Sequence, residues 1–358
     1  MIYDKTTLDD LRLEGDVLAD QAVSSYFPSR KAELQIILDG LEINSSKLPS
    51  TVSDDFKHLY NSVLKPLNDL EEEKVAKGHD FFSKNASDIM LLLGFLSLPY
   101  CYAAAKGAQV LGRSNRIIAE PGKRLLETAE FVFDITQPKA FEPRGKGFIS
   151  ILKVRLIHAV IRWYVTNSGT WDQDQLGVPV NQEDMAGTNL SFSLIPVRGM
   201  RKIGINILPK ESDAYIQFWN FIGSRLGLND LLLPKNNKEC YVLEKRIRER
   251  HFESSAIGKE LTASLLKYFE SVTVNSPIEG KSKAFVQYML GDQISDLLGI
   301  KVDQVSRLSF RPFPELMKVK NVLLRKDDNY LSAFTQFKAR SGEMTDESIE
   351  LVLPKGIK

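Results

Sequence analysis

One histidine and two arginines interrupt an otherwise apolar stretch of the chain, VRLIHAVIRWY, at residues 154–164. Arg155, His158 and Arg162 are three and four residues apart, so on a helix they form one stripe. The remaining positions are mostly Leu, Ile, Val and Ala, which predicts that this helix is buried. Burying two guanidinium groups costs free energy unless anionic groups meet them. The stripe therefore predicts either acidic side chains from elsewhere in the fold or a bound anionic ligand.

The same stripe has the groups that haem requires. An imidazole can ligate the iron, and arginines one turn away can donate charge-assisted hydrogen bonds to the propionates. The alternative is a hydrogen-bonded core histidine between arginines that form ion pairs within the protein, because protein partners usually satisfy buried polar groups. The stripe alone leaves both interpretations open.

Other motifs that could carry chemistry are weaker. His58, His79 and His251 are scattered, so we expect them at the surface, and no HExxH or other cluster has the spacing of a zinc or non-haem iron site. The segment GAQVLG at 107–112 is followed by Arg-Ser instead of the Lys-Ser/Thr of a P-loop, and no GxSxG marks a serine nucleophile.

A second polar pair occurs in GKRLLETAEFV, at residues 122–132. Arg124 and Thr128 are four residues apart and share one helix face, while Leu and Phe residues supply the apolar face. Taken alone, this pattern is typical of an ordinary amphipathic helix.

These residues must be positioned by helices, because apolar residues recur at helical spacing through most of the chain. We expect an all-α fold, with a first helix that follows Thr7 and ends before Pro28. The further predicted helices cover 31–43, 52–65, 66–84, 87–104, 122–135, 147–167, 181–192, 211–226, 239–252, 260–270 and 282–298.

One uncharged segment, residues 89–105, could cross a membrane by composition. It is short for a bilayer, which needs about 20 apolar residues. Gly94, Ser97 and Pro99 interrupt it. We therefore expect a buried core helix there, and membrane association is not favoured.

Composition excludes several classes of protein. The 358 residues carry 47 Lys and Arg against 46 Asp and Glu, so the overall charge does not point to a nucleic-acid partner. Cys101 and Cys240 form no CxxC pair, so neither a disulfide framework nor a thiolate zinc site is indicated. The polar, acidic N-terminal segment lacks the pattern of an export signal, so we expect a cytoplasmic protein.

Several segments together resemble the family of MpaB-type oxygenases and rubber oxygenase (latex-clearing protein) catalytic domains. The similar segments are KVRLIHAVIRW, GVPVNQEDMAGTNLSFS (177–193), the preceding Arg124-x-x-x-Thr128 pair, LEGDVLADQAV, FLSLPYCYAAAKGAQVLGRSNRI (95–117) and YMLGDQISDLLGI (288–300). They span most of the chain in the family's order, which makes the resemblance more specific than any single motif.

The resemblance implies a globin-like helical core that binds haem b, with His158 as the axial iron ligand. It places Arg124 and Thr128 near the haem pocket as catalytic candidates, and Arg162 matches the arginine that follows the ligand. Rubber-cleaving members have a lysine directly before the motif threonine, where this chain has Glu127. The rubber-cleaving members are exported because their polymer is extracellular. The predicted cytoplasmic location therefore argues for a substrate other than rubber.

The predicted function is a haem-b-dependent oxygenase that uses O₂ to attack an apolar, alkene-containing small molecule. His158 would ligate iron, Arg155, Arg162 and Arg124 would bind the cofactor, and Tyr100 and Tyr102 would add polar contacts. Two alternatives are a non-catalytic, globin-like haem carrier or sensor, and a haem-free helical scaffold with paired arginines. We expect one large domain over 1–300 and an irregular C-terminal extension over 301–358. Neither the substrate nor the oligomeric state follows from the sequence.

Overall fold

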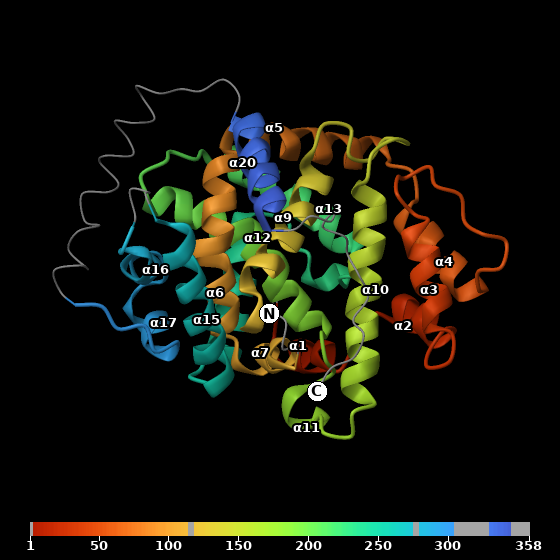
Figure 1. Cartoon of the computed structure of the whole chain (residues 1–358), viewed down its shortest axis with the longest axis horizontal. Coiled ribbons are helices and arrows are strands. Elements are labelled where there is room, and N and C mark those ends of the chain that lie inside the picture. The colour runs from red at the N-terminus through yellow and green to blue at the C-terminus, as the bar shows by residue number, and fades with distance from the viewer. Residues whose placement is uncertain (1–2, 114–117, 275–278, 304–328, 345–358) are drawn as a thin grey trace.

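Segments with helical periodicity form helices along most of the described chain (Figure 1). The structure is a computed structural model that describes residues 3–113, 118–274, 279–303 and 329–344. Within these ranges there is no β-strand, which confirms the predicted all-α fold class.

Seven helices lie within a few residues of their predicted bounds. They are α3 (Lys31–Asp39), α4 (Asp54–Val63), α9 (Pro121–Thr136), α10 (Gly147–Thr166), α13 (Pro209–Arg225), α14 (Asn237–His251) and α15 (Ala256–Val272). Helix α12 (Gln182–Lys202) starts as predicted but continues past the predicted end at 192, with Pro196 inside it. Before residue 300, two helices of the described chain were not predicted, α7 (Ala105–Gly112) and α11 (Gln173–Leu176). A short 3₁₀ turn, η2, covers Asp230–Leu232.

The predicted first helix is two helices, α1 (Lys5–Arg12) and α2 (Val17–Ser24). The chain turns between them, and Asp16 becomes the N-terminal cap of α2 by accepting a hydrogen bond from the backbone N–H of Ala19 at 3.2 Å. A carboxylate that caps a helix satisfies backbone donors that would otherwise lack partners. Helix α2 therefore begins at a buried acidic residue.

The predicted helices 66–84 and 87–104 are one continuous helical run. Helix α5 (Asp69–Leu92) passes into a π-helical turn, η1 (Leu93–Ser97), and then into α6 (Leu98–Tyr102). No Gly or Pro stands between residues 84 and 87 to end the first helix. The π turn precedes Pro99, which has no backbone N–H to donate, and the Leu98 N–H bonds to the Leu93 carbonyl five residues back.

Among the described residues, one helical run, Asp69–Tyr102, is long and apolar enough to cross a membrane. Core helices of soluble proteins have the same length and composition, so this is weak evidence for a membrane span. Half of its most apolar window is buried inside the protein, and Phe82, Ala86 and Ile89 are fully buried there.

The C-terminal part of the described chain is also helical. Helix α16 (Ser282–Leu290) and α17 (Asp292–Leu297) replace one predicted helix, because Gly291 between them has φ +83°, outside the helical region. Within the predicted irregular extension, α20 (Asn329–Met344) is a helix that packs on α5 and α9. The predicted domain boundary at residue 300 stays a prediction.

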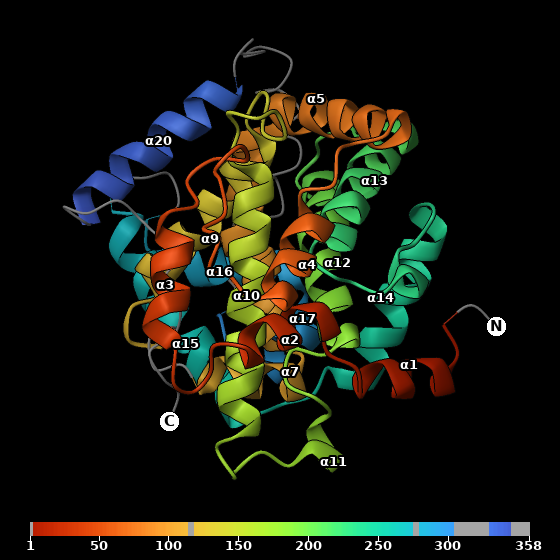
Figure 2. The ribbon, with the colours of Figure 1, turned by 90° about the vertical axis from the view of Figure 1, so that its right-hand side faces the viewer.

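Helix α10 lies between two groups of helices (Figure 1). Helices α2 and α4 pack on one side of it, and α9 packs on another. Figure 2 shows α3 alongside α10, with α2 and α4 next to it. The helix that carries His158 is therefore central, as its apolar sequence predicts.

Candidate functional site

Helix α10 is anchored at its first turn by a side chain from a distant segment. Asn44 accepts hydrogen bonds through Oδ1 from the backbone N–H groups of Phe148 at 3.0 Å and Ile149 at 3.3 Å. Its Nδ2 donates to the carbonyl oxygen of Ala140 at 2.9 Å. These bonds satisfy donors that a helix start leaves free. The helix then runs to Thr166 without a Gly or Pro.

His158 lies near the middle of α10, and its Nδ1 is buried without a hydrogen-bond partner. Burial, and then the positive charges of Arg162 and Arg124, lower the pKa of His158 to about 3. The imidazole is therefore neutral at physiological pH, which is the form that ligates a metal. The side chain belongs to a half-buried stripe with Val154, Ile157 and Ile161.

Arg155 is fully engaged by the protein. Its Nε and Nη2 donate to the Asp16 carboxylate, the latter bond measuring 2.9 Å. Nη1 donates to the Ser62 hydroxyl at 3.3 Å and to the Arg225 carbonyl at 3.4 Å. Gly227, with φ +84°, lets the backbone approach, since a Cβ there would lie 2.8 Å from Arg155. All three guanidinium nitrogens of Arg155 thus already donate to groups of the protein.

Arg162 is only partly engaged. Its Nε lies 2.7 Å from Oδ1 of Asp20, and Nη1 donates to the carbonyl of Val180 at 3.1 Å. Burial raises the pKa of Asp20, and the Arg162 charge opposes that rise. Nη2 of Arg162 is buried and has no hydrogen-bond partner. This arginine therefore keeps one buried donor next to the histidine whose pKa it lowers.

Arg124 and Thr128 lie on α9, the neighbour of α10. Nη1 of Arg124 pairs with Oε2 of Glu127 at 3.1 Å, and the Thr128 hydroxyl donates to the Arg124 carbonyl at 3.0 Å within the helix. Arg124 still acts electrostatically on His158. Of the predicted set, Arg162 and Arg124 thus act on His158 electrostatically, while the Thr128 hydroxyl bonds within its own helix.

The two tyrosines predicted as polar contacts differ in their surroundings. Tyr100 donates its hydroxyl to Glu244, a buried carboxylate that Arg198 and Arg248 also contact, at 2.7 and 2.9 Å. Tyr102 is almost completely buried, and burial raises the pKa of its hydroxyl. The hydroxyl of Tyr100 is therefore occupied by the protein.

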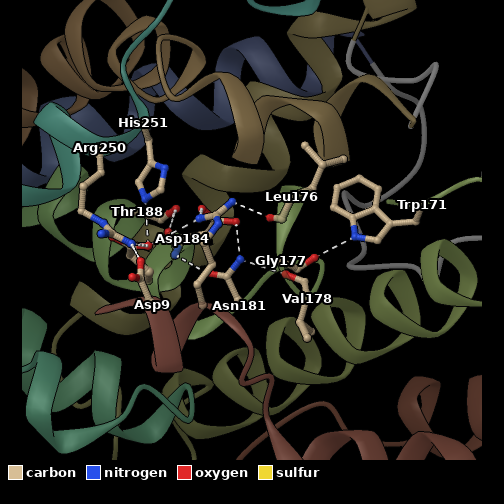
Figure 3. A network of polar contacts seen from close by, with 12 residues as sticks. Asp9, Trp171, Leu176, Gly177, Val178, Asn181, Asp184, Thr188, Arg250 and His251 are labelled. Carbon is tan, nitrogen blue, oxygen red and sulfur yellow. Dashed lines mark hydrogen bonds and ion pairs between the residues drawn. The ribbon is translucent and has the colours of Figure 1, made fainter. Parts of the chain in front are cut away.

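A second buried polar cluster, around Glu183 at the start of α12, was not predicted (Figure 3). Its carboxylate lies 2.7 Å from Nε of Arg250, 2.8 Å from Nε2 of His251 and 3.6 Å from Nη1 of Arg12. Burial would raise the pKa of Glu183, but His251 and Arg250 outweigh it and hold the pKa below its usual value. Figure 3 shows Arg250 and His251 of α14 pointing toward Asp9 of α1 and toward the first turns of α12 around Asp184.

The expectation that His251 lies at the surface was wrong, since only 3% of it is exposed. His79 is half-buried, and its Nε2 lies 3.1 Å from the Ile135 carbonyl oxygen, whereas His58 is exposed as predicted. The second cluster could have been sought only at the Asn-Gln-Glu-Asp sequence that contains Glu183. By itself this sequence indicates only the start of a helix, because Asn181 caps α12. In the described part of the chain, no group of three or more His, Cys, Asp or Glu residues could hold a metal ion.

Comparison with known proteins places these residues within a matched region. A family model described as "ER-bound oxygenase mpaB/B'/Rubber oxygenase, catalytic domain" matches residues 86–319, more than half of the chain. This range includes Arg124, His158, Arg162 and Glu183, but not Asp16 and Asp20.

Two individual proteins are similar. The rubber oxygenase of Streptomyces sp. (strain K30) is 26% identical over 211 residues, which are 58% of this chain. The match spans about half of that relative, 51% of its length. A solved structure of latex clearing protein in the closed state superposes with a TM-score of 0.77 over 98% of this chain and 93% of that one. At 20% identity, this second likeness shows the fold alone.

Proposed function

The chain belongs to the family of MpaB-type and rubber oxygenase catalytic domains, and from this premise we propose that it is a haem-b-dependent oxygenase. We propose that it uses O₂ to attack an apolar, alkene-containing small molecule. The observation that carries the proposal is His158, a neutral histidine on a central helix whose ring nitrogen Nδ1 the protein leaves without a partner.

The residues around His158 suit an iron porphyrin in part. His158 would ligate the iron, because an imidazole must be unprotonated to bind a metal. Arg162 would hold a propionate, since its buried Nη2 is a charged donor that lacks an acceptor. Arg124 would add positive charge, and Arg155, bound to Asp16, would not take part. When bound, haem b would supply the iron that activates O₂.

The surrounding side chains suit an apolar substrate. The half-buried residues on the His158 face of α10 are Val154, Ile157 and Ile161, none of which can donate or accept a side-chain hydrogen bond. Such a surface favours hydrocarbon and excludes water from the reacting groups. Glu127 is the acidic group nearest in sequence to Thr128, and its pairing with Arg124 keeps it oriented on α9.

The visible spectrum tests the cofactor. Wild-type protein supplied with haem should show a Soret band that shifts on reduction, and His158→Ala should lose it or shift it strongly. His58→Ala is the matched control, because His58 is exposed and should leave the spectrum unchanged. A wild-type protein without Soret absorbance after haem supply would support the haem-free scaffold, in which Arg155 and Arg162 only form ion pairs.

Activity separates the oxygenase from the haem carrier or sensor. Haem-loaded protein should consume O₂ and produce carbonyl compounds when small alkenes are added, and Arg162→Gln should lower both haem affinity and turnover. If the ferrous protein binds O₂ reversibly and leaves every alkene unchanged, the carrier or sensor is the better interpretation.

A further inference from the structure

Three aromatic rings from two distant segments form a cage beside the C-terminal half of α10. Trp163 and Tyr164 belong to α10, and Phe27 lies between α2 and α3. The ring centroids are 5.0 Å apart for Phe27 and Trp163, 5.7 Å for Phe27 and Tyr164, and 5.3 Å for Trp163 and Tyr164. The rings stand at 63°, 80° and 83° to one another and therefore meet edge to face.

The ammonium group of Lys31 occupies that point. Its Nζ lies 5.1 Å from the ring centroid of Phe27, 5.4 Å from that of Trp163 and 4.7 Å from that of Tyr164. It also donates a hydrogen bond to the Tyr164 hydroxyl at 3.0 Å. The distances to Phe27 and Trp163 are within the roughly 6 Å over which a ring face attracts a cation, whereas Tyr164 meets Nζ through its hydroxyl oxygen. The cage is therefore built to hold positive charge.

Lys31 is held without a counter-charge. Its neighbour Arg30 lies over the Tyr26 ring at 5.1 Å but donates two hydrogen bonds to Glu33, at 2.8 and 2.5 Å. No carboxylate of the described residues forms an ion pair with Lys31. The aromatic rings are thus its main source of electrostatic stabilisation. They must compensate for the water that a strongly hydrated ammonium group gives up on entering the cage.

A methylated cation would fit the cage better than lysine does. Quaternary ammonium groups are the ligands that aromatic cages recognise, and their methyl groups add contact with the rings. Trp163, Tyr164 and Lys31 are half-buried, so the cage reaches the solvent, and buried Phe27 forms its base. We propose that the Phe27–Trp163–Tyr164 cage is a binding site for a quaternary ammonium ligand, with Lys31 as a built-in competitor.

This site is independent of the proposed oxygenase function. Trp163 and Tyr164 follow His158 by five and six residues, which on a helix turns them away from its face by about 120 to 140°. A simpler role, in which Lys31 only ties α3 to α10, predicts no affinity for external cations. The two roles therefore differ in what happens when Lys31 is removed.

The test is a titration of the full chain with choline and with tetramethylammonium, followed by calorimetry and tryptophan fluorescence. Lys31→Ala should bind both with a dissociation constant about tenfold lower than wild type, because the competing cation is gone. The neutral isostere 3,3-dimethylbutanol should not bind. Lys77→Ala, which removes an exposed lysine, is the control and should behave as wild type.

Three results would overturn the proposal: no choline binding by Lys31→Ala, equal binding of the neutral isostere, or undiminished binding when Trp163→Leu is added. Lys31→Met, which keeps the apolar stem, repeats the test, and circular dichroism confirms folding of each variant. Vesicles of phosphatidylcholine and of phosphatidylglycerol identify the source of the ligand. Trp163-dependent binding to the former alone indicates a lipid headgroup, and binding of choline without vesicle binding indicates a free ligand.

Discussion

His158 and His251 are both enclosed by the fold, and the protein surrounds them in opposite ways. His251 lies 2.8 Å from the buried carboxylate of Glu183, whereas the strongest charges acting on His158 come from two arginines. In both histidines, Nδ1 has no hydrogen-bond partner. The fold therefore supplies a counter-charge to one histidine and holds the other neutral. His158, kept neutral and with Nδ1 unpartnered, is available to a ligand, whereas His251 is one member of the buried polar cluster around Glu183.

The largest expected effect is on the Glu183 cluster. Glu183→Ala removes the buried carboxylate that Arg250, His251 and Arg12 share, although Arg250 keeps Asp9 at 2.7 Å and Arg12 keeps Asp184 at 3.0 Å. We therefore expect a loss of about 3 kcal/mol of unfolding free energy, the lower end of the range for breaking a buried ion pair. Urea unfolding measures it. Glu249→Ala, on the exposed side of α14 where Glu249 lies 3.7 Å from Lys245, is the control and should cost less than about 1 kcal/mol. Equal losses in the two variants would contradict a structural role for the cluster.

Lowering the pH should destabilise the haem-free protein, because the fold holds His158 neutral. The pKa of His158 is about 3 in the folded state, whereas an unfolded histidine has a pKa of about 6.5. Below pH 6.5 the unfolded state binds more protons, so stability falls as the pH falls, by about 2 kcal/mol at pH 5. His158→Gln should lack this loss, and the exposed His58→Gln should keep it.

The difference between wild type and His158→Gln is the quantity to measure, by urea unfolding at pH 7, 6 and 5. Burial raises the pKa of Glu130 to about 7, so that group contributes with the opposite sign over the same pH range in both proteins. If the two proteins lose stability in parallel, His158 is not held neutral by the fold.

The smallest expected effect is at Arg162, which forms an ion pair with Asp20 and also lowers the pKa of His158. Arg162→Ala removes the partner of Asp20, but the Asp20 side chain is 38% exposed and can be hydrated. We expect a loss of about 1–2 kcal/mol. The pKa of His158 should rise, because one of the charges that lower it is gone. An NMR titration of the imidazole measures this rise, and an unchanged pKa would show that burial alone keeps His158 neutral.

Much of the central helix could be predicted from its residues. The apolar run around His158 has no Gly or Pro after its first residue, and the structure forms α10 there over Gly147–Thr166. The residues also predicted that acidic groups or an anionic ligand must meet the buried arginines. Identifying those groups required the fold, because Asp16 and Asp20 lie 139 and 142 residues away in sequence.

The elements that were missed have physical reasons. The break at residues 84–87 did not occur because no residue there prevents a helix, whereas Gly15 and Asp16 could end one helix and cap the next. His251 was predicted at the surface because the histidines are scattered in the sequence and belong to no cluster with metal-ligand spacing. Its burial depends on Glu183, which approaches from α12, 68 residues earlier in the sequence.

The sequence by itself determined that the fold is all-α, that the helix around His158 is buried, and that its histidine and arginines share a stripe. These are local properties, set by side-chain spacing and by the cost of burying charge. Only the tertiary structure decided that Asp16, Ser62 and the Arg225 carbonyl engage all three guanidinium nitrogens of Arg155, while Arg162 keeps a free donor. That distinction depends on which carboxylate and carbonyl oxygens the packing of α2 brings within hydrogen-bond distance, and helical spacing within one segment contains no information about them.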